Sequence, residues 1–269
     1  MFRALLEGLI DTEGLDFRVE TRDTDTLNQM ASGGGPDVTA ISIAHYPAVA
    51  AHYQLFNHGG SMGRNYGPVL IARQPRSLES LARRRVGVPG LGTTAALVLR
   101  LAAPEIVPVV IPISPPQRSF EALRSGEVEA IVLIHEGRLT YRQEGFANLL
   151  DLGEWWQQRT GLPLPLGGNV IRRDLGPTLI AAADRLIHRS IQHALSDREA
   201  AIGWLLKRGG PLDRPELVDT YLSLYANADT LDWGDDGRAG IRALLAEGAA
   251  AGLIAPVAGV DLVGGEAGR

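Results

Sequence analysis

The chain has 269 residues, of which 45% are hydrophobic, and its formal net charge is −5. This length supports one large or two smaller folded domains, and the composition gives no reason to expect disorder. An acidic chain has no positive field for nucleic acid, so we expect no nucleic-acid partner. The absence of cysteine excludes disulfides, thiolate metal sites and cysteine nucleophiles. No apolar run is long enough for a bilayer and no export signal opens the chain, so the sequence predicts a cytoplasmic protein without membrane contact.

The first candidate binding residue lies where a strand meets a helix. The pattern of residues 23–30 predicts a short helix capped by Thr24 or Asp25, and the apolar run VTAISI then predicts a buried strand. A second helix begins near Ala44, which places Ser42 at the junction. A hydroxyl and free backbone N–H groups at such a junction suit an anionic ligand. An ordinary N-cap serine is the alternative.

Three histidines follow within a short segment. His45 and His52 are seven residues apart, so one helix face could carry both, and His58 lies further along. No carboxylate joins them at a spacing typical of metal ligands. The sequence therefore predicts no metal site.

A glycine turn at residues 90–92 predicts a second binding element. A strand over residues 85–89 leads into GLGTTAALVLRLAA, so Thr93 and Thr94 stand at the start of an alanine-rich helix. Hydroxyls and unpaired N–H groups at a helix start suit a carboxylate or phosphate. The spacing matches neither a dinucleotide fingerprint nor a P-loop, because the third glycine and the Gly-Lys pair are absent. We predict a small-anion site here, with plain helix capping as the alternative.

The candidate catalytic residue follows the apolar run of residues 130–134. This unbroken run of branched side chains is typical of a strand covered on both faces in a parallel sheet. His135 comes directly after it, at the strand end where ligands bind in open α/β sheets. Its ordinary pKa near neutrality suits a group that takes up and returns a proton. The alternative is a hydrogen-bonded structural histidine.

The order of the elements predicts an α/β protein with two lobes. Strands near Val69 and Gly168 flank a block that has its own strands and helices. We therefore assign residues 1–75 and 170–269 to a first lobe and residues 76–169 to a second. Two hinge crossings of this kind are typical of proteins that close around a ligand. Thr93, Thr94 and His135 then belong to the second lobe, and Ser42 to the first.

Four sequence blocks carry a resemblance to a known family. They are GGSMGRNYGP, VGVPGLGTTA, EVEAIVLIHEGRLTY and, most specifically, DLGEWWQQRTGLPLPLGGNVIRRDLG. Over nearly the whole chain, the sequence resembles the 1,4-dihydroxy-6-naphthoate synthases of the futalosine route to menaquinone. The resemblance implies the fold of type II periplasmic binding proteins.

The resemblance also implies an activity and a set of site residues. Members of the family are lyases that convert cyclic dehypoxanthinyl futalosine to 1,4-dihydroxy-6-naphthoate, release a three-carbon fragment (dihydroxyacetone), and use no metal or organic cofactor. The family's base falls on His135 and its paired threonines fall on Thr93 and Thr94. Its binding tripeptide falls on Ala40, Ile41 and Ser42, with Ala40 in place of the usual lysine.

The family pattern differs from the chain at one end, and two other functions stay open. The family begins with a strand and an SPCPNDT loop ahead of the helix that starts here at Phe2, so we expect coding sequence for them upstream. A non-catalytic small-anion binding protein would have the same fold. So would chorismate dehydratase of the same pathway, which fits the EWW and IHE blocks less well. The sequence makes no prediction of oligomeric state.

Overall fold

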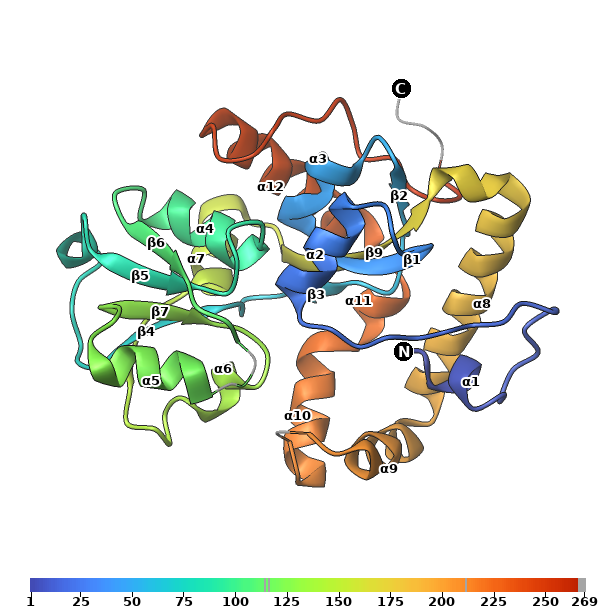
Figure 1. Cartoon of the computed structure of the whole chain (residues 1–269), viewed down its shortest axis with the longest axis horizontal. Coiled ribbons are helices and arrows are strands. Elements are labelled where there is room, and N and C mark those ends of the chain that lie inside the picture. Colours follow the sequence, from blue (N-terminus) through green and yellow to red (C-terminus); the bar gives the residue numbers. More distant parts are fainter. Residues whose placement is uncertain (114, 116, 211, 266–269) are drawn as a thin grey trace.

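Two β-sheets lie side by side in the computed structural model, which describes residues 1–113, 115, 117–210 and 212–265 (Figure 1). The first sheet is built around the longest strand, β9, which pairs antiparallel with three others. Its members are β1 (Val38–Ser42), β2 (Tyr53–Leu55), β3 (Ser61–Gly63) and β9 (Leu164–Arg172).

The second sheet has the strand order β6-β5-β7-β4-β8. Its central strand β7 runs parallel to β5 and antiparallel to β4, so the sheet is mixed and not wholly parallel as predicted. Ala130 and Val132 pack in the cluster that contains α4, while Ile131 and Leu133 pack with α5, which explains the unbroken apolar run. The strands are β4 (Val69–Ala72), β5 (Arg85–Val88), β6 (Val107–Val110), β7 (Ala130–Leu133) and β8 (Ala147–Asp151).

Helices cover both sheets. In Figure 1, α4 and α7 lie above the second sheet and α5 and α6 below it, while α8 runs along the outer side of the first lobe and α9 and α10 lie at the bottom of the view. The described helices include none that combines the length and hydrophobicity needed to cross a bilayer. They are α1 (Arg3–Leu6), α2 (Thr24–Ser32), α3 (Tyr46–Val49), α4 (Thr94–Ala102), α5 (Gln117–Ser125), α6 (Gly137–Thr140), α7 (Leu152–Thr160), α8 (Gly176–Ser196), α9 (Arg198–Arg208), α10 (Pro215–Tyr225), α11 (Ala228–Leu231) and α12 (Gly234–Ala250), with 3-10 turns at Ile43–His45, Glu79–Leu81 and Arg173–Leu175.

The crossings between the sheets lie earlier in the chain than predicted. β4 pairs with β7 and β8 of the second sheet, although the sequence analysis assigned it to the first lobe. β9 enters the first sheet at Leu164, ahead of the predicted boundary at 170. The prediction was wrong at both points because an apolar strand pattern shows that a strand is buried and does not show which sheet buries it.

The chain crosses between the sheets twice, first through residues 64–68 between β3 and β4 and then through residues 152–163 between β8 and β9. Glycines let these two crossing segments pack backbone to backbone. A Cβ on Gly153 would lie 1.9 Å from the carbonyl oxygen of Tyr66, and one on Gly67 would lie 2.6 Å from the amide nitrogen of Gly153. No side chain fits in either place. The glycines of the GRNYGP and DLGEWW blocks therefore hold the two crossings in direct contact.

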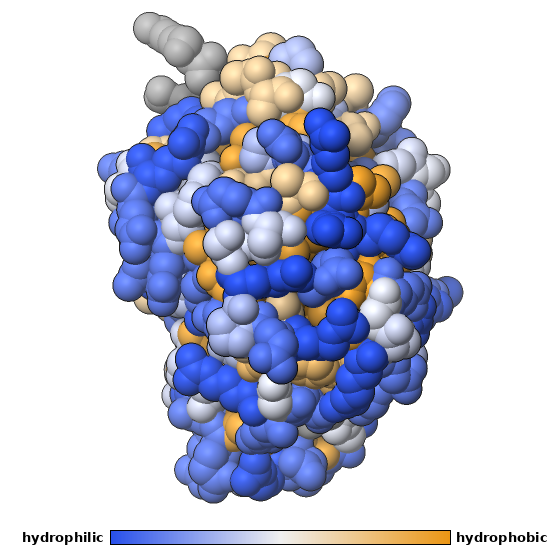
Figure 2. All heavy atoms as spheres, turned by 90° about the vertical axis from the view of Figure 1, so that its left-hand side faces the viewer, coloured by the Kyte–Doolittle hydropathy of each residue, from blue (hydrophilic) through white to orange (hydrophobic). Residues whose placement is uncertain are grey.

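The end of the second lobe that faces the viewer in Figure 2 is mainly hydrophilic, with hydrophobic surface showing in several separate places.

Two tryptophans, Trp156 and Trp233, are among the largest fully buried side chains of the described residues. Trp156 donates its indole N–H to the carbonyl oxygen of Pro163 at 3.2 Å. The paired-tryptophan block thus contributes one core anchor, as an amphipathic aromatic does when its N–H finds a partner.

Candidate active site

His135 lies just beyond the carboxyl end of β7, in a strained backbone conformation. Its φ is +51°, in the left-handed region that few residues other than glycine adopt. Histidine tolerates this region better than branched residues do, although such strain typically costs about 1–3 kcal/mol. The turn redirects the chain from β7 into α6. It therefore carries the imidazole away from the sheet at the strand end where ligands bind.

Both ring nitrogens of His135 face residues that lie outside the second lobe. Nε2 is 3.3 Å from Thr24 Oγ1, at the first turn of α2. Nδ1 is 3.4 Å from the Tyr221 hydroxyl on α10, and the ring of Tyr225 meets the imidazole edge-on with 5.9 Å between centroids. The ring is thus held between the two lobes.

Burial lowers the pKa of His135, and the nearby carboxylate of Glu136 partly opposes this effect. Removing an imidazole from water disfavours its charged form. The ring is therefore neutral at pH 7, with one nitrogen lone pair available to take a proton.

Thr93 and Thr94 are 2% exposed, and both hydroxyls have partners inside the protein. Thr93 is the N-cap of α4: its Oγ1 accepts from the Ala96 amide at 3.2 Å and donates to the Gly90 carbonyl at 2.7 Å. Thr94 Oγ1 donates to the Leu166 carbonyl at 2.9 Å and accepts from the Ala44 amide at 3.2 Å. The capping interpretation is confirmed for Thr93, and the anion site stays a prediction.

Residues 40–42 form the end of β1 at the edge of the first sheet. Ala40 is exposed, whereas Ile41 and Ser42 are buried. The Ser42 amide donates to Asn28 Oδ1 at 2.9 Å, and Asn28 Nδ2 lies 3.3 Å from Ser42 Oγ. Ser42 does not cap the following turn with its side chain. Its polar groups are turned toward α2 instead.

Helix α2 connects the three predicted sites. Thr24 contacts His135, Asn28 binds Ser42, and Asp25 lies against the turn before Thr93, where a Cβ on Gly90 would be 2.0 Å from its carboxylate. The N-cap is Asp23, which accepts from the amides of Asp25 and Thr26, and not Thr24 or Asp25 as predicted.

The sequence pattern of α2 predicts an ordinary capped helix and does not by itself mark Thr24 and Asn28 as site residues. Their spacing held a signal, because Thr24, Asn28 and Ser32 recur every four residues and form one polar face. Asn28 is buried and Thr24 is partly buried, and polar groups removed from water need polar partners. Here the partners of Thr24 and Asn28 are the candidate site residues His135 and Ser42, whereas Ser32 pairs with His45.

Two histidines of the early segment, His45 and His58, point to separate partners. His45 Nε2 is 2.8 Å from Ser32 Oγ, and Gly92 leaves room for its ring. His58 Nε2 is 2.9 Å from Asp184 on α8. Within the described residues, no three or more histidine and carboxylate side chains gather as a metal would require.

Arg138 ties the turn after His135 to the crossings. Its Nη1 donates to Asp151 Oδ2 at 2.6 Å and to the Gly67 carbonyl at 3.0 Å, and its guanidinium lies over the Tyr66 ring. Asp151 is buried and also caps α7. A buried charge pair with additional hydrogen bonds fixes geometry more than it adds stability. The segment that carries the imidazole is thereby attached to both crossings.

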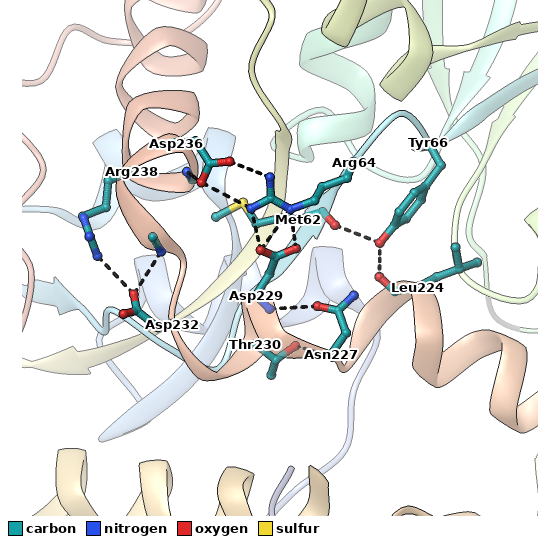
Figure 3. A network of polar contacts seen from close by, with 12 residues as sticks. Met62, Arg64, Tyr66, Leu224, Asn227, Asp229, Thr230, Asp232, Asp236 and Arg238 are labelled. Carbon is teal, nitrogen blue, oxygen red and sulfur yellow. Dashed lines mark hydrogen bonds and ion pairs between the residues drawn. The ribbon is translucent and has the colours of Figure 1, made fainter.

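The first crossing is also anchored to the C-terminal helices (Figure 3). Arg64 donates to the carboxylates of Asp229 and Asp236, and the Tyr66 hydroxyl bonds to the carbonyl oxygens of Met62 and Leu224. Burial raises the pKa of Tyr66 to about 12, so the phenol is neutral. Since Leu224 is in α10, this network also sets the position of the helix that carries Tyr221.

Comparison with solved structures establishes the fold. The alkanesulfonate-binding protein SsuA of Xanthomonas axonopodis, solved with MOPS bound, superposes with a TM-score of 0.64 at 14% identity, over 90% of this chain and 84% of that one. At this identity the likeness concerns the fold alone. It confirms the predicted periplasmic-binding-protein-like architecture.

Closer relatives establish the family. A structure from Archaeoglobus fulgidus is 35% identical with a TM-score of 0.86, covering 94% of this chain and 93% of that one. A 1,4-dihydroxy-6-naphthoate synthase of Thermus thermophilus is 39% identical over 256 residues, which are 95% of this chain and 92% of the relative. The family model described as menaquinone biosynthesis matches residues 1–250. The chain therefore belongs to the menaquinone biosynthesis family, in which these naphthoate synthases are found.

Proposed function

We propose that this chain is a carbon–carbon lyase that forms 1,4-dihydroxy-6-naphthoate in menaquinone biosynthesis, with His135 as its general base. The relative of that name matches over nearly the full length. The observation that carries the proposal is the position of His135, whose neutral ring lies between the lobes with contacts from α2 and α10. A neutral imidazole held against the other lobe is suited to proton abstraction in a closed site.

The proposed substrate is cyclic dehypoxanthinyl futalosine, a small molecule that carries a carboxylate. The backbone N–H groups in the first turn of α4 would hold this carboxylate, because the hydroxyls of Thr93 and Thr94 are already engaged. His135 would take a proton from an acidic C–H or hydroxyl group of the substrate. Carbon–carbon cleavage would then release dihydroxyacetone, driven by aromatisation of the ring. We place this reaction in the cytoplasm and assign it no cofactor.

Closure of the two lobes would complete the site. The second lobe supplies His135 and the α4 helix start, and the first supplies Thr24 and the Ser42 junction. A substrate would enter while these elements are apart and be enclosed when they meet. Closure also excludes water and orients the reacting groups.

The test is formation of the naphthoate from the cyclic substrate by the purified protein. His135→Ala should lower kcat by about two to four orders of magnitude while substrate binding stays near normal, the usual range for a general base. The control is His52→Ala, because His52 is an exposed histidine of the first lobe. An unchanged kcat in His135→Ala would remove this residue from the mechanism.

The second candidate is a binding protein without chemistry, favoured by the fold likeness to an alkanesulfonate-binding protein. It predicts a heat of binding and no turnover with the same substrate. Chorismate, supplied in parallel, tests dehydration by the related enzyme of the pathway. Product analysis by mass separates these outcomes from the proposed cleavage.

A further inference from the structure

Two tyrosines of α10 face the imidazole of His135. The Tyr221 hydroxyl is 3.4 Å from Nδ1, whereas Tyr225 presents its ring to the imidazole and its hydroxyl is not a hydrogen-bond partner of the histidine. The two phenol rings pack against each other with 4.8 Å between centroids. Tyr221 and Tyr225 thus contact the same histidine in different ways, one through its oxygen and one through its ring.

The two nitrogens of His135 face different surroundings. Nε2 faces Thr24, the neighbour of Asp25, which packs against the turn that leads into α4. Nε2 thus faces α2, the helix that packs against the turn before the proposed carboxylate site. Nδ1 faces the Tyr221 hydroxyl on α10. Because a neutral imidazole has one N–H and one lone pair, the proton must be on Nδ1 if Nε2 is to act as the base.

Tyr221 is suited to accept a hydrogen bond from Nδ1. Burial raises its pKa, so the phenol remains neutral and has an oxygen lone pair to offer. Among the described residues, the ring nitrogens have Thr24 and Tyr221 as hydrogen-bond partners, and the adjacent Glu136 is not one of them. The bond between Tyr66 and the Leu224 carbonyl anchors α10 to the first crossing. The Tyr221 phenol is therefore held in a fixed position relative to the first crossing.

We propose that Tyr221 is a positioning residue for His135, whose phenolic oxygen accepts the Nδ1–H bond and leaves the Nε2 lone pair directed toward Thr24 and the substrate. This inference rests on the proposed function, because it assigns the base role to His135. The residue that orients the base comes from the lobe opposite the base. The correct tautomer is then selected only when the lobes are together.

Ring-nitrogen NMR of the 15N-histidine-labelled protein tests the tautomer directly. The chain has six histidines, and His135→Gln identifies the signals of this one. We expect the Nδ1–H form of His135 in the wild type and a shift toward the Nε2–H form in Tyr221→Phe. Tyr225→Phe is the matched control on the same helix and should keep the wild-type tautomer. An Nε2–H form in the wild type, or no change in Tyr221→Phe, would overturn the proposal.

Kinetics with the cyclic substrate supplies the second readout. Tyr221→Phe should lower kcat about tenfold to a hundredfold with KM nearly unchanged, by analogy with the loss of a hydrogen-bond partner that orients a metal-binding histidine. A loss confined to KM would contradict a positioning role. If the wild type forms no naphthoate, the proposed function fails, and the tautomer measurement still decides the role of Tyr221.

Discussion

At the scale of single residues, the environment of His135 predicts the pH dependence of the reaction. Burial lowers its pKa from the ordinary 6.5, and Glu136 partly opposes this. Since the neutral ring is the base, kcat/KM should be constant near pH 7 and fall only as the pH drops through a value below 6.5. Glu136→Gln should move this acid limb to still lower pH. A limb above 6.5, or one that Glu136→Gln raises, would contradict this reading of the site.

Sequence reasoning identified the base candidate but not its partners. His135 was found because a buried strand ends beside it, and the end of a strand can be recognised from the neighbouring residues of the sequence alone. Thr24 and Tyr221 are 111 and 86 residues away, and nothing local marks either as a neighbour of the ring. For Thr93 and Thr94 the sequence could not separate anion binding from helix capping, because hydroxyls in both roles occur in the same sequence pattern.

At the scale of elements, the contact between α2 and the turn before α4 predicts a sensitive glycine. A Cβ on Gly90 would lie 2.0 Å from Asp25 Oδ1 and 2.8 Å from its Cβ, so Gly90→Ala must push the two elements apart. We expect KM to rise about tenfold, because a shift of about 1 Å at a binding element has effects of this order or larger. Gly203→Ala, in open space on α9, should leave KM unchanged.

A second substitution tests the cause of that effect. Asp25→Ala removes the carboxylate that the new methyl group would meet and keeps the Cβ at 2.8 Å, so the double variant Asp25→Ala/Gly90→Ala should reverse part of the rise in KM. Such recovery is the non-additivity expected of residues in contact. Equal KM values for Gly90→Ala with and without Asp25→Ala would show that the contact is not responsible.

The elements themselves were largely predictable and their partners were not. β7 was predicted from its apolar run, and α4 from a glycine turn followed by threonines and alanines, because these patterns depend on local periodicity. β4 was placed in the wrong lobe, although its existence was predicted correctly. Pairing is decided by contacts such as Val69 with Leu133, which lie far apart in the chain.

At the scale of the whole molecule, the two crossings and the active-site turn form one connected unit. Gly67 and Gly153 bring the crossings into contact, and Arg138 attaches the turn after His135 to both. Arg64 and Tyr66 attach the same region to α10, α11 and α12 (Figure 3). A movement of the lobes must therefore move the base, and the helix that orients it, through the same short segment.

This arrangement predicts that the Arg138–Asp151 pair matters far more than a surface pair. The side chains are 18% and 4% exposed, so Arg138→Met leaves a buried carboxylate without its counter-charge. We expect a loss of about 3 kcal/mol in unfolding free energy, within the range for a broken buried pair, measured by urea unfolding. The matched control is Arg159→Met, whose partner Glu247 and own side chain are 29% and 54% exposed, and it should cost at most about 1 kcal/mol. Because the loss would arise at the crossings, kcat should also fall in Arg138→Met at temperatures where the protein is still folded. Equal stability losses in the two variants would show that the crossings are held by their glycine contacts and not by this ion pair.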